Sequence, residues 1–135
     1  MNPPGSFYAA TAVALGGGIG SLLRYMVGRW MTQLVGPQAM MTFPWATLTV
    51  NVTGSMAMGM LMAWLARHGQ EGEQYRLLIG VGLLGGFTTF SSFSLELMVL
   101  IERGQAGQAF VYGAVSVLAG LSALYIGLIV MRIAQ

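Results

Sequence analysis

The sequence has no cysteine, no lysine and no aspartate, and its 135 residues carry only six arginines and four glutamates as charged side chains. Without cysteine there is no disulfide, thiolate metal ligand or thiol nucleophile. Charged residues make up 7% of the chain, against about 25% in an ordinary soluble domain. The net charge of +2 comes from scattered arginines that form no phosphate-binding patch. With 56% apolar residues, this composition excludes a soluble enzyme, a nucleic-acid-binding module and a disordered tail, and indicates an integral membrane protein.

The few charges divide the chain into stretches long enough to cross a membrane, which takes about 20 mostly apolar residues. We therefore predict an all-α fold in which residues 1–135 form one membrane domain. Its four predicted spans are 7–29, 44–66, 77–101 and 108–131. Gly36, Pro37 and Pro44 separate the first two spans, with Pro44 expected in the first turn of the second.

The arginines are divided almost equally between the two predicted membrane faces. Three lie on the side of the termini and two on the other, with Arg24 one turn inside the first span. The positive-inside rule therefore barely selects an orientation. Either a weak bias is corrected by other signals, or the chain inserts in both orientations and pairs antiparallel with itself.

Polar side chains recur on one face of the second span, where Thr47, Asn51 and Ser55 follow at four-residue steps. A threonine or serine hydroxyl can bond back to its own helix. The amide of Asn51 has more donors and acceptors than one helix can satisfy, so Asn51 is either an interhelical clasp or part of a permeation path. In the fourth span, Tyr112 and Ser116 are spaced to extend the same polar track.

The third span is poor material for an uninterrupted helix. Residues 85–96 read GGFTTFSSFSLE, two glycines followed by five hydroxyl side chains within seven residues. Because glycine is flexible and hydroxyls compete for backbone hydrogen bonds, we predict a helix that is broken near the bilayer midplane. Such a break must be buried or line a cavity, and broken spans expose carbonyls to cations and N–H groups to anions.

Three further residues of this span carry alternative interpretations. Phe90 and Phe93 share a face if the segment beyond the break is helical. They are either core aromatics or, because the edge of a ring is positive, the lining of an anion path. Glu96 either reaches for Arg24 or Arg103 from near the span end, or takes part in a channel or proton relay.

These segments resemble the small bacterial fluoride channels, the Fluc or CrcB family. The resemblance rests on GGFTTFSSFSLE at 85–96, on TLTVNVTGS at 47–55 and on GGGIGSLLRY at 16–25, and it extends over nearly the whole chain. Ser92 stands where the family usually has threonine, and Ala46 stands where it often has glycine. Both replacements keep the side chain small.

The resemblance implies an antiparallel, dual-topology homodimer in the bacterial cytoplasmic (inner) membrane, with two pores that export fluoride passively. It implies that Phe90 and Phe93 present ring edges to the ion and that Asn51 donates a hydrogen bond to it. The other matching pore positions are Thr47, Tyr112, Ser116 and Glu96. It also implies a structural sodium ion at the dimer centre, bound by the backbone carbonyls of Gly85 and Thr88 from both subunits.

Two other functions compete with this interpretation. A proton-coupled small multidrug exporter also has four spans and two orientations, but it uses a carboxylate in the first span, and this first span has none. A structural membrane subunit without an ion path is the third possibility. Catalysis is not expected, because the spans hold no Ser/His/Asp set and the sequence no zinc cluster.

Overall fold

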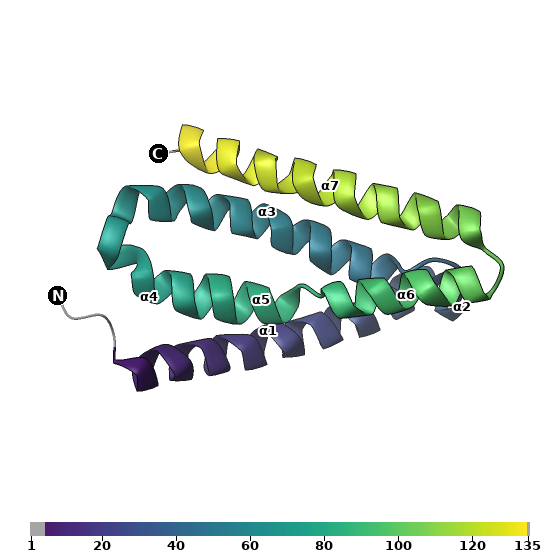
Figure 1. Cartoon of the computed structure of the whole chain (residues 1–135), viewed down its shortest axis with the longest axis horizontal. Helices are drawn as coiled ribbons and strands as arrows, with labels where there is room; N and C mark the ends of the chain where they lie inside the picture. The colour runs from purple at the N-terminus through teal and green to yellow at the C-terminus, as the bar shows by residue number, and fades with distance from the viewer. Residues whose placement is uncertain (1–4, 135) are drawn as a thin grey trace.

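The computed structural model describes residues 5–134, and every regular element in that range is helical, as predicted. The elements are α1 (Ser6–Val35), α2 (Pro37–Thr42), α3 (Trp45–His68), the 3-10 turn η1 (Gly69–Gly72), α4 (Glu73–Tyr75), the π-helical η2 (Arg76–Leu84), α5 (Gly85–Phe87), α6 (Phe90–Glu102) and α7 (Ala106–Ile133). Within this range, three segments are long and apolar enough to cross a membrane: Phe7–Val35, Trp45–Glu102 and Ala106–Ile133. The second of them is a helical hairpin that reverses at η1 (Figure 1).

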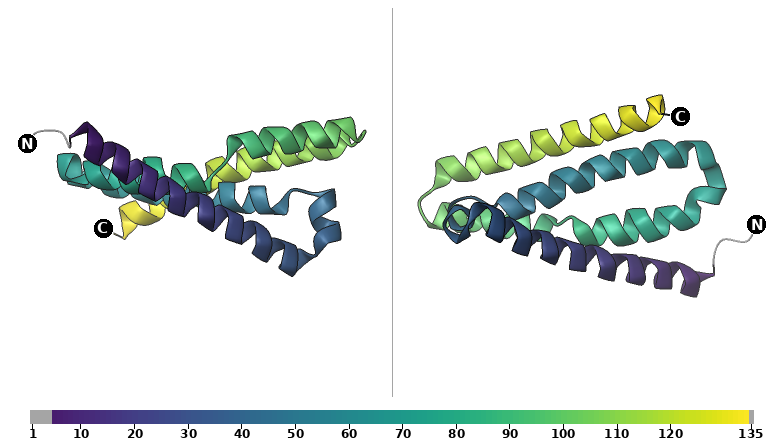
Figure 2. Two further views of the ribbon diagram at one scale, coloured as in Figure 1. Left: turned by 90° about the horizontal axis from the view of Figure 1, so that it is seen from below. Right: turned by 180° about the vertical axis from the view of Figure 1, so that it is seen from behind.

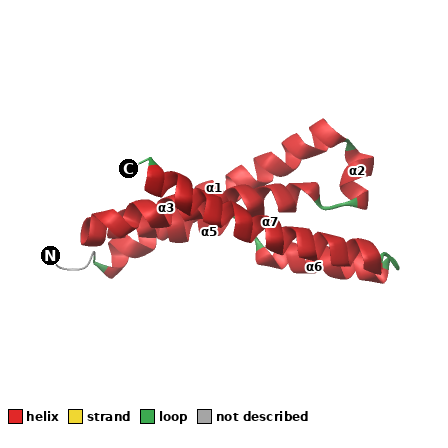
Figure 3. Ribbon diagram, turned by 90° about the horizontal axis from the view of Figure 1, so that it is seen from above, coloured by secondary structure: helices red, strands yellow, loops and turns green. Residues whose placement is uncertain are grey.

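The helices form an elongated bundle that splits at one end. α3 packs along α7, while α1 packs against η2 and α5. The start of α1, the turn η1 and the end of α7 lie together at one end (Figure 1). At the other end two branches diverge: α6 with the first half of α7, and the end of α1 with α2 and the start of α3 (Figures 2 and 3).

Several helix boundaries differ from the sequence prediction because local backbone geometry, rather than charge, sets them. α1 continues past Arg29 to Val35 and ends at Gly36, whose φ of +86° favours glycine. Pro37 then begins α2, a short helix that the sequence analysis did not predict. Pro44 lies just outside α3 as its N-cap residue, so its predicted place in the first turn is wrong by one position.

The second half of the hairpin, which runs from η2 through α5 to α6, is interrupted at Thr88 and Thr89, where ψ changes to 158° and 119° and the backbone is extended. The two glycines before them stay helical in α5. They serve a different purpose, because a Cβ at Gly86 would collide with the backbone of Gly17 in α1. The break therefore lies at the first two hydroxyl residues of the motif and not at the glycine pair.

The backbone of α1 lies in close contact with the backbones of η2 and α5. A Cβ at Gly20 would overlap the Leu83 carbonyl, whereas a Cβ at Gly18 would meet nothing within 4 Å. Gly20→Ala is expected to destabilise the protein by about 1–3 kcal/mol, as overpacking does. Gly18→Ala, in the same helix, should leave the melting temperature in detergent close to that of the wild type. Equal melting temperatures for the two variants would contradict this packing.

Candidate functional site

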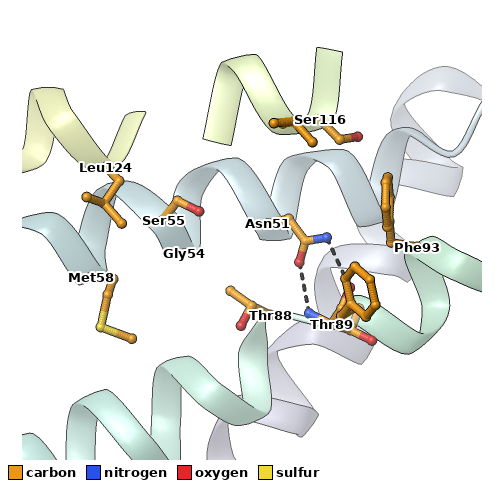
Figure 4. A pocket seen from close by; sticks show the side chains of 11 residues that line it. Asn51, Gly54, Ser55, Met58, Thr88, Thr89, Phe93, Ser116 and Leu124 are labelled. Carbon is orange, nitrogen blue, oxygen red and sulfur yellow. Dashed lines mark hydrogen bonds between the residues drawn. The ribbon is translucent and has the colours of Figure 1, made fainter. Parts of the chain in front are cut away.

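A cavity of about 330 Å³ opens beside the helix interruption, between α3, α6 and α7. We call it the Phe90 cavity, after a residue of its lining. Figure 4 shows Asn51, Thr88 and Thr89 at the break, while Ser55 and Ser116 lie on the neighbouring helices α3 and α7. Four residues that the sequence analysis singled out as pore positions line it: Asn51, Phe90, Phe93 and Ser116. The remaining lining residues are Gly54, Ser55, Met58, Thr88, Thr89, Val117 and Leu124.

Asn51 joins α3 to the interruption through both ends of its amide. Its Nδ2 donates to the Thr89 carbonyl at 3.1 Å, and its Oδ1 accepts from the Thr89 N–H at 2.8 Å (Figure 4). Asn51 is thus a clasp between two helical arms. Its amide has two donor hydrogens, so the second remains available to a ligand in the cavity. The structure therefore allows both interpretations of this residue at once.

The clasp also changes the hydrogen bonding of the interruption. In a continuous helix the Thr89 N–H would bond to the Gly85 carbonyl; here it donates to Asn51, and the Gly85 carbonyl is released. The Thr88 carbonyl accepts only a long hydrogen bond, 3.4 Å, from Arg24 Nη1. Beyond the break, Thr89 Oγ1 accepts the Ser92 N–H at 3.2 Å and caps α6. The interruption thus has one released carbonyl and one weakly bonded carbonyl on one side, and the N-terminus of a helix on the other.

Two phenylalanine rings and a serine hydroxyl also line the Phe90 cavity. Phe90 is 79% exposed, and its ring centroid lies 5.8 Å from that of the half-buried Phe93. Phe93 in turn lies 5.2 Å from the ring of Tyr112. Ser116 Oγ is buried and has no hydrogen-bond partner among the described residues. An unpartnered buried hydroxyl in a cavity wall is a candidate ligand donor.

Glu96 lies next to this wall and binds two hydroxyls. Thr47 Oγ1 donates to Glu96 Oε1 at 2.6 Å, and the Tyr112 hydroxyl donates to Oε2 at 2.7 Å. Tyr112 is completely buried. The alternative in which Glu96 pairs with Arg24 or Arg103 is wrong, because its two carboxylate oxygens accept hydroxyls and no ion pair joins it to either arginine among the described residues. We refer to Thr47, Glu96 and Tyr112 as the Glu96 cluster.

The predicted site residues are therefore brought together in two adjoining groups. Asn51, Phe90, Phe93 and Ser116 line the cavity, and the Glu96 cluster continues from Phe93 through its contact with Tyr112. Gly85 lies apart from the cavity and is exposed, whereas Thr88 borders it. Within residues 5–134 no three histidine or carboxylate side chains gather into a metal site.

A bundle of long apolar helices with a polar cavity at a helix interruption defines a multi-pass membrane protein with a candidate ion path. The sequence matches the family described as CrcB-like protein, Camphor Resistance (CrcB), over residues 11–128, and the chain belongs to this family. The family membership predicted from the motifs is thereby confirmed.

Curated relatives match over almost their full length. The fluoride-specific ion channel FluC of Novosphingobium aromaticivorans is 54% identical over 124 residues, which cover 92% of this chain and 96% of that protein. FluC of Erythrobacter litoralis is 53% identical over 133 residues, covering 97% and 96%. FluC of Caulobacter vibrioides is 50% identical over 121 residues, covering 89% and 92%. These relatives are named as ion channels and not as enzymes.

Proposed function

We propose that the protein is a fluoride-selective channel through which fluoride leaves the cytoplasm passively, across the bacterial inner membrane. The observation that carries this proposal is the lining of the Phe90 cavity, which combines neutral donors and aromatic rings with no charged side chain. The names of the relatives, all fluoride-specific ion channels, agree with it.

The chemistry of this lining suits a small, strongly hydrated anion. A selective pore must replace the water around the ion with close donors, yet bind the ion weakly enough to release it. The spare hydrogen of the Asn51 amide and the unpartnered Ser116 hydroxyl are such donors. The positive ring edges of Phe90 and Phe93 add stabilisation without a formal charge. The N-terminus of α6, which begins at Phe90, adds a partial positive charge at the same place.

We extend the path from the Phe90 cavity past the Glu96 cluster. With no anion nearby, the hydroxyl protons of Thr47 and Tyr112 point at the Glu96 carboxylate. Hydroxyl groups rotate, so each can turn its proton toward a passing fluoride and then back. In this proposal the carboxylate keeps the two hydroxyls in place between ions, while the hydroxyls carry the contact with the ion.

We further propose four membrane spans per subunit, an antiparallel homodimer with two pores, and a structural sodium ion at its centre. The chain's own carbonyls fit such an ion: that of Gly85 has lost its helical partner, and that of Thr88 has only the long bond from Arg24. Two oxygens from one subunit do not satisfy a cation, which supports the contribution of a second copy. Sodium would add positive potential at the centre of an assembly that conducts an anion.

A liposome assay tests the proposed function. Purified protein in liposomes loaded with fluoride should release the ion rapidly, measured with a fluoride electrode, whereas liposomes loaded with chloride should retain it. Equal release of both anions, or of neither, would overturn the proposal.

Sodium replacement tests the structural ion. When sodium is replaced on both sides by an organic cation too large for the carbonyl site, fluoride efflux should fall about tenfold or more, which corresponds to about 1.4 kcal/mol. The loss should reverse when sodium is returned. Efflux that is unchanged after complete sodium removal would rule out a sodium ion with this role.

A further inference from the structure

A second cavity, also of about 330 Å³, lies between the two branches at the split end of the bundle. We call it the Arg103 cavity. Residues of α2 and the start of α3 form one wall, and residues of α6 form the other. Among its lining residues are Met41, Glu96, Val99 and Arg103. No sequence motif indicates this cavity, because its walls come from segments far apart in the chain.

The Glu96 cluster contacts both the Arg103 cavity and the Phe90 cavity. Glu96 itself lines the Arg103 cavity. Its carboxylate accepts the Tyr112 hydroxyl, and the ring of Tyr112 contacts Phe93, which lines the Phe90 cavity. A path that continues from the Phe90 cavity past the Glu96 cluster leads toward the Arg103 cavity.

The two charged residues that line the Arg103 cavity, Glu96 and Arg103, differ in how fully hydrogen bonds satisfy them. Glu96 is held by two hydroxyls, and its charge repels an approaching anion. Arg103, at the C-terminal end of α6, is exposed and donates one hydrogen bond, from Nη1 to the Met41 carbonyl at 3.1 Å. It forms no ion pair with any residue between positions 5 and 134. Its guanidinium has five N–H donors, so most of them face water or a ligand.

We propose that the Arg103 cavity is a mouth of the fluoride path and that Arg103 raises the anion concentration in it, offsetting the repulsion from Glu96. This inference rests on the proposed channel function. Charged groups at the entrance of a cleft concentrate ions of opposite sign and raise their rate of entry. Arg103 is thus a residue of the entrance, while selection between anions stays with the Phe90 cavity.

Removal of the charge tests the role of Arg103. In liposomes at low salt, Arg103→Gln should slow fluoride efflux about two- to tenfold, and the deficit should shrink near 1 M of an impermeant salt, where the screening length falls to about 3 Å. Arg103→Lys should lie closer to the wild type. Arg132→Gln, which removes the same charge from the end of α7 outside either cavity, is the matched control. A deficit that salt does not change, or none at low salt, would overturn the entrance role.

Cysteine modification tests whether the ion passes through the Arg103 cavity. The chain has no cysteine of its own, so a thiol reagent reacts only with the introduced one. A bulky, charged thiol reagent should slow efflux through Val99→Cys, whose side chain lines the Arg103 cavity. Met98→Cys, one position along α6 and outside the lining of the cavity, should show no comparable loss under the same treatment. If the modified Val99→Cys protein conducts like the unmodified one, the cavity is not on the path. If the wild type itself releases no fluoride, the proposed channel function fails instead.

Discussion

Asn51→Ala is expected to reduce fluoride efflux by at least about 100-fold, which corresponds to about 2.8 kcal/mol. The substitution removes both hydrogen bonds to the Thr89 backbone, and it removes the spare donor of the cavity wall. A buried backbone group left without a partner costs about 1–3 kcal/mol. The Thr89 N–H is then free to return to the Gly85 carbonyl, so the interruption loses the contact that holds it open.

The liposome assay measures this effect, with two variants that separate its causes. Asn51→Asp keeps an acceptor for the Thr89 N–H but loses both amide donors and places a negative charge in the path, so efflux should again be lost while the protein stays folded in detergent. Thr49→Ala lies two positions away on α3, where the hydroxyl bonds only within its own helix, and should conduct like the wild type. Wild-type efflux in Asn51→Asp would show that the amide donors are not needed.

The third span illustrates what a sequence can predict about such a site. Two glycines and a run of hydroxyls indicate that the helix is weak, and an interruption is indeed present. Its position at Thr88 and Thr89 depends on Asn51, which lies 38 residues earlier and supplies the competing hydrogen bonds. Local propensity identifies a fragile segment, whereas a tertiary contact selects the residue at which it opens.

The partners of Glu96 could not be predicted from the charges in the sequence. The sequence offers arginines as partners for a carboxylate in an apolar span, but the structure supplies the hydroxyls of Thr47 and Tyr112. These come from α3 and α7, which pack along each other and each contact α6. Their distances along the chain follow no motif, so the cluster becomes visible only once the helices are placed.

In the proposed path the Phe90 cavity selects the ion and the Arg103 cavity attracts it. Charge-free donors suit the Phe90 cavity, since a fixed cation at close range would bind fluoride too tightly to release it. At the Arg103 cavity an exposed guanidinium attracts ions through water, where the interaction is screened and weak. A chain with so few charges can thus use one of them at the entrance and leave the selective region neutral.

Phe90 is exposed in the subunit, so its replacement should change fluoride efflux without changing the free energy of unfolding. Phe90→Ile should reduce fluoride efflux about tenfold or more, because it removes a ring edge from the cavity, and a factor of ten needs only about 1.4 kcal/mol. The ring is 79% exposed within one subunit, so the folded subunit should lose no more than about 0.5 kcal/mol, as at other exposed positions. Phe110→Ile makes the same change at a ring that is 77% exposed and lines neither cavity, and it should conduct normally. If both variants conduct equally well in the liposome assay, aromatic edges do not line the path, and the amide and hydroxyl donors must act without them.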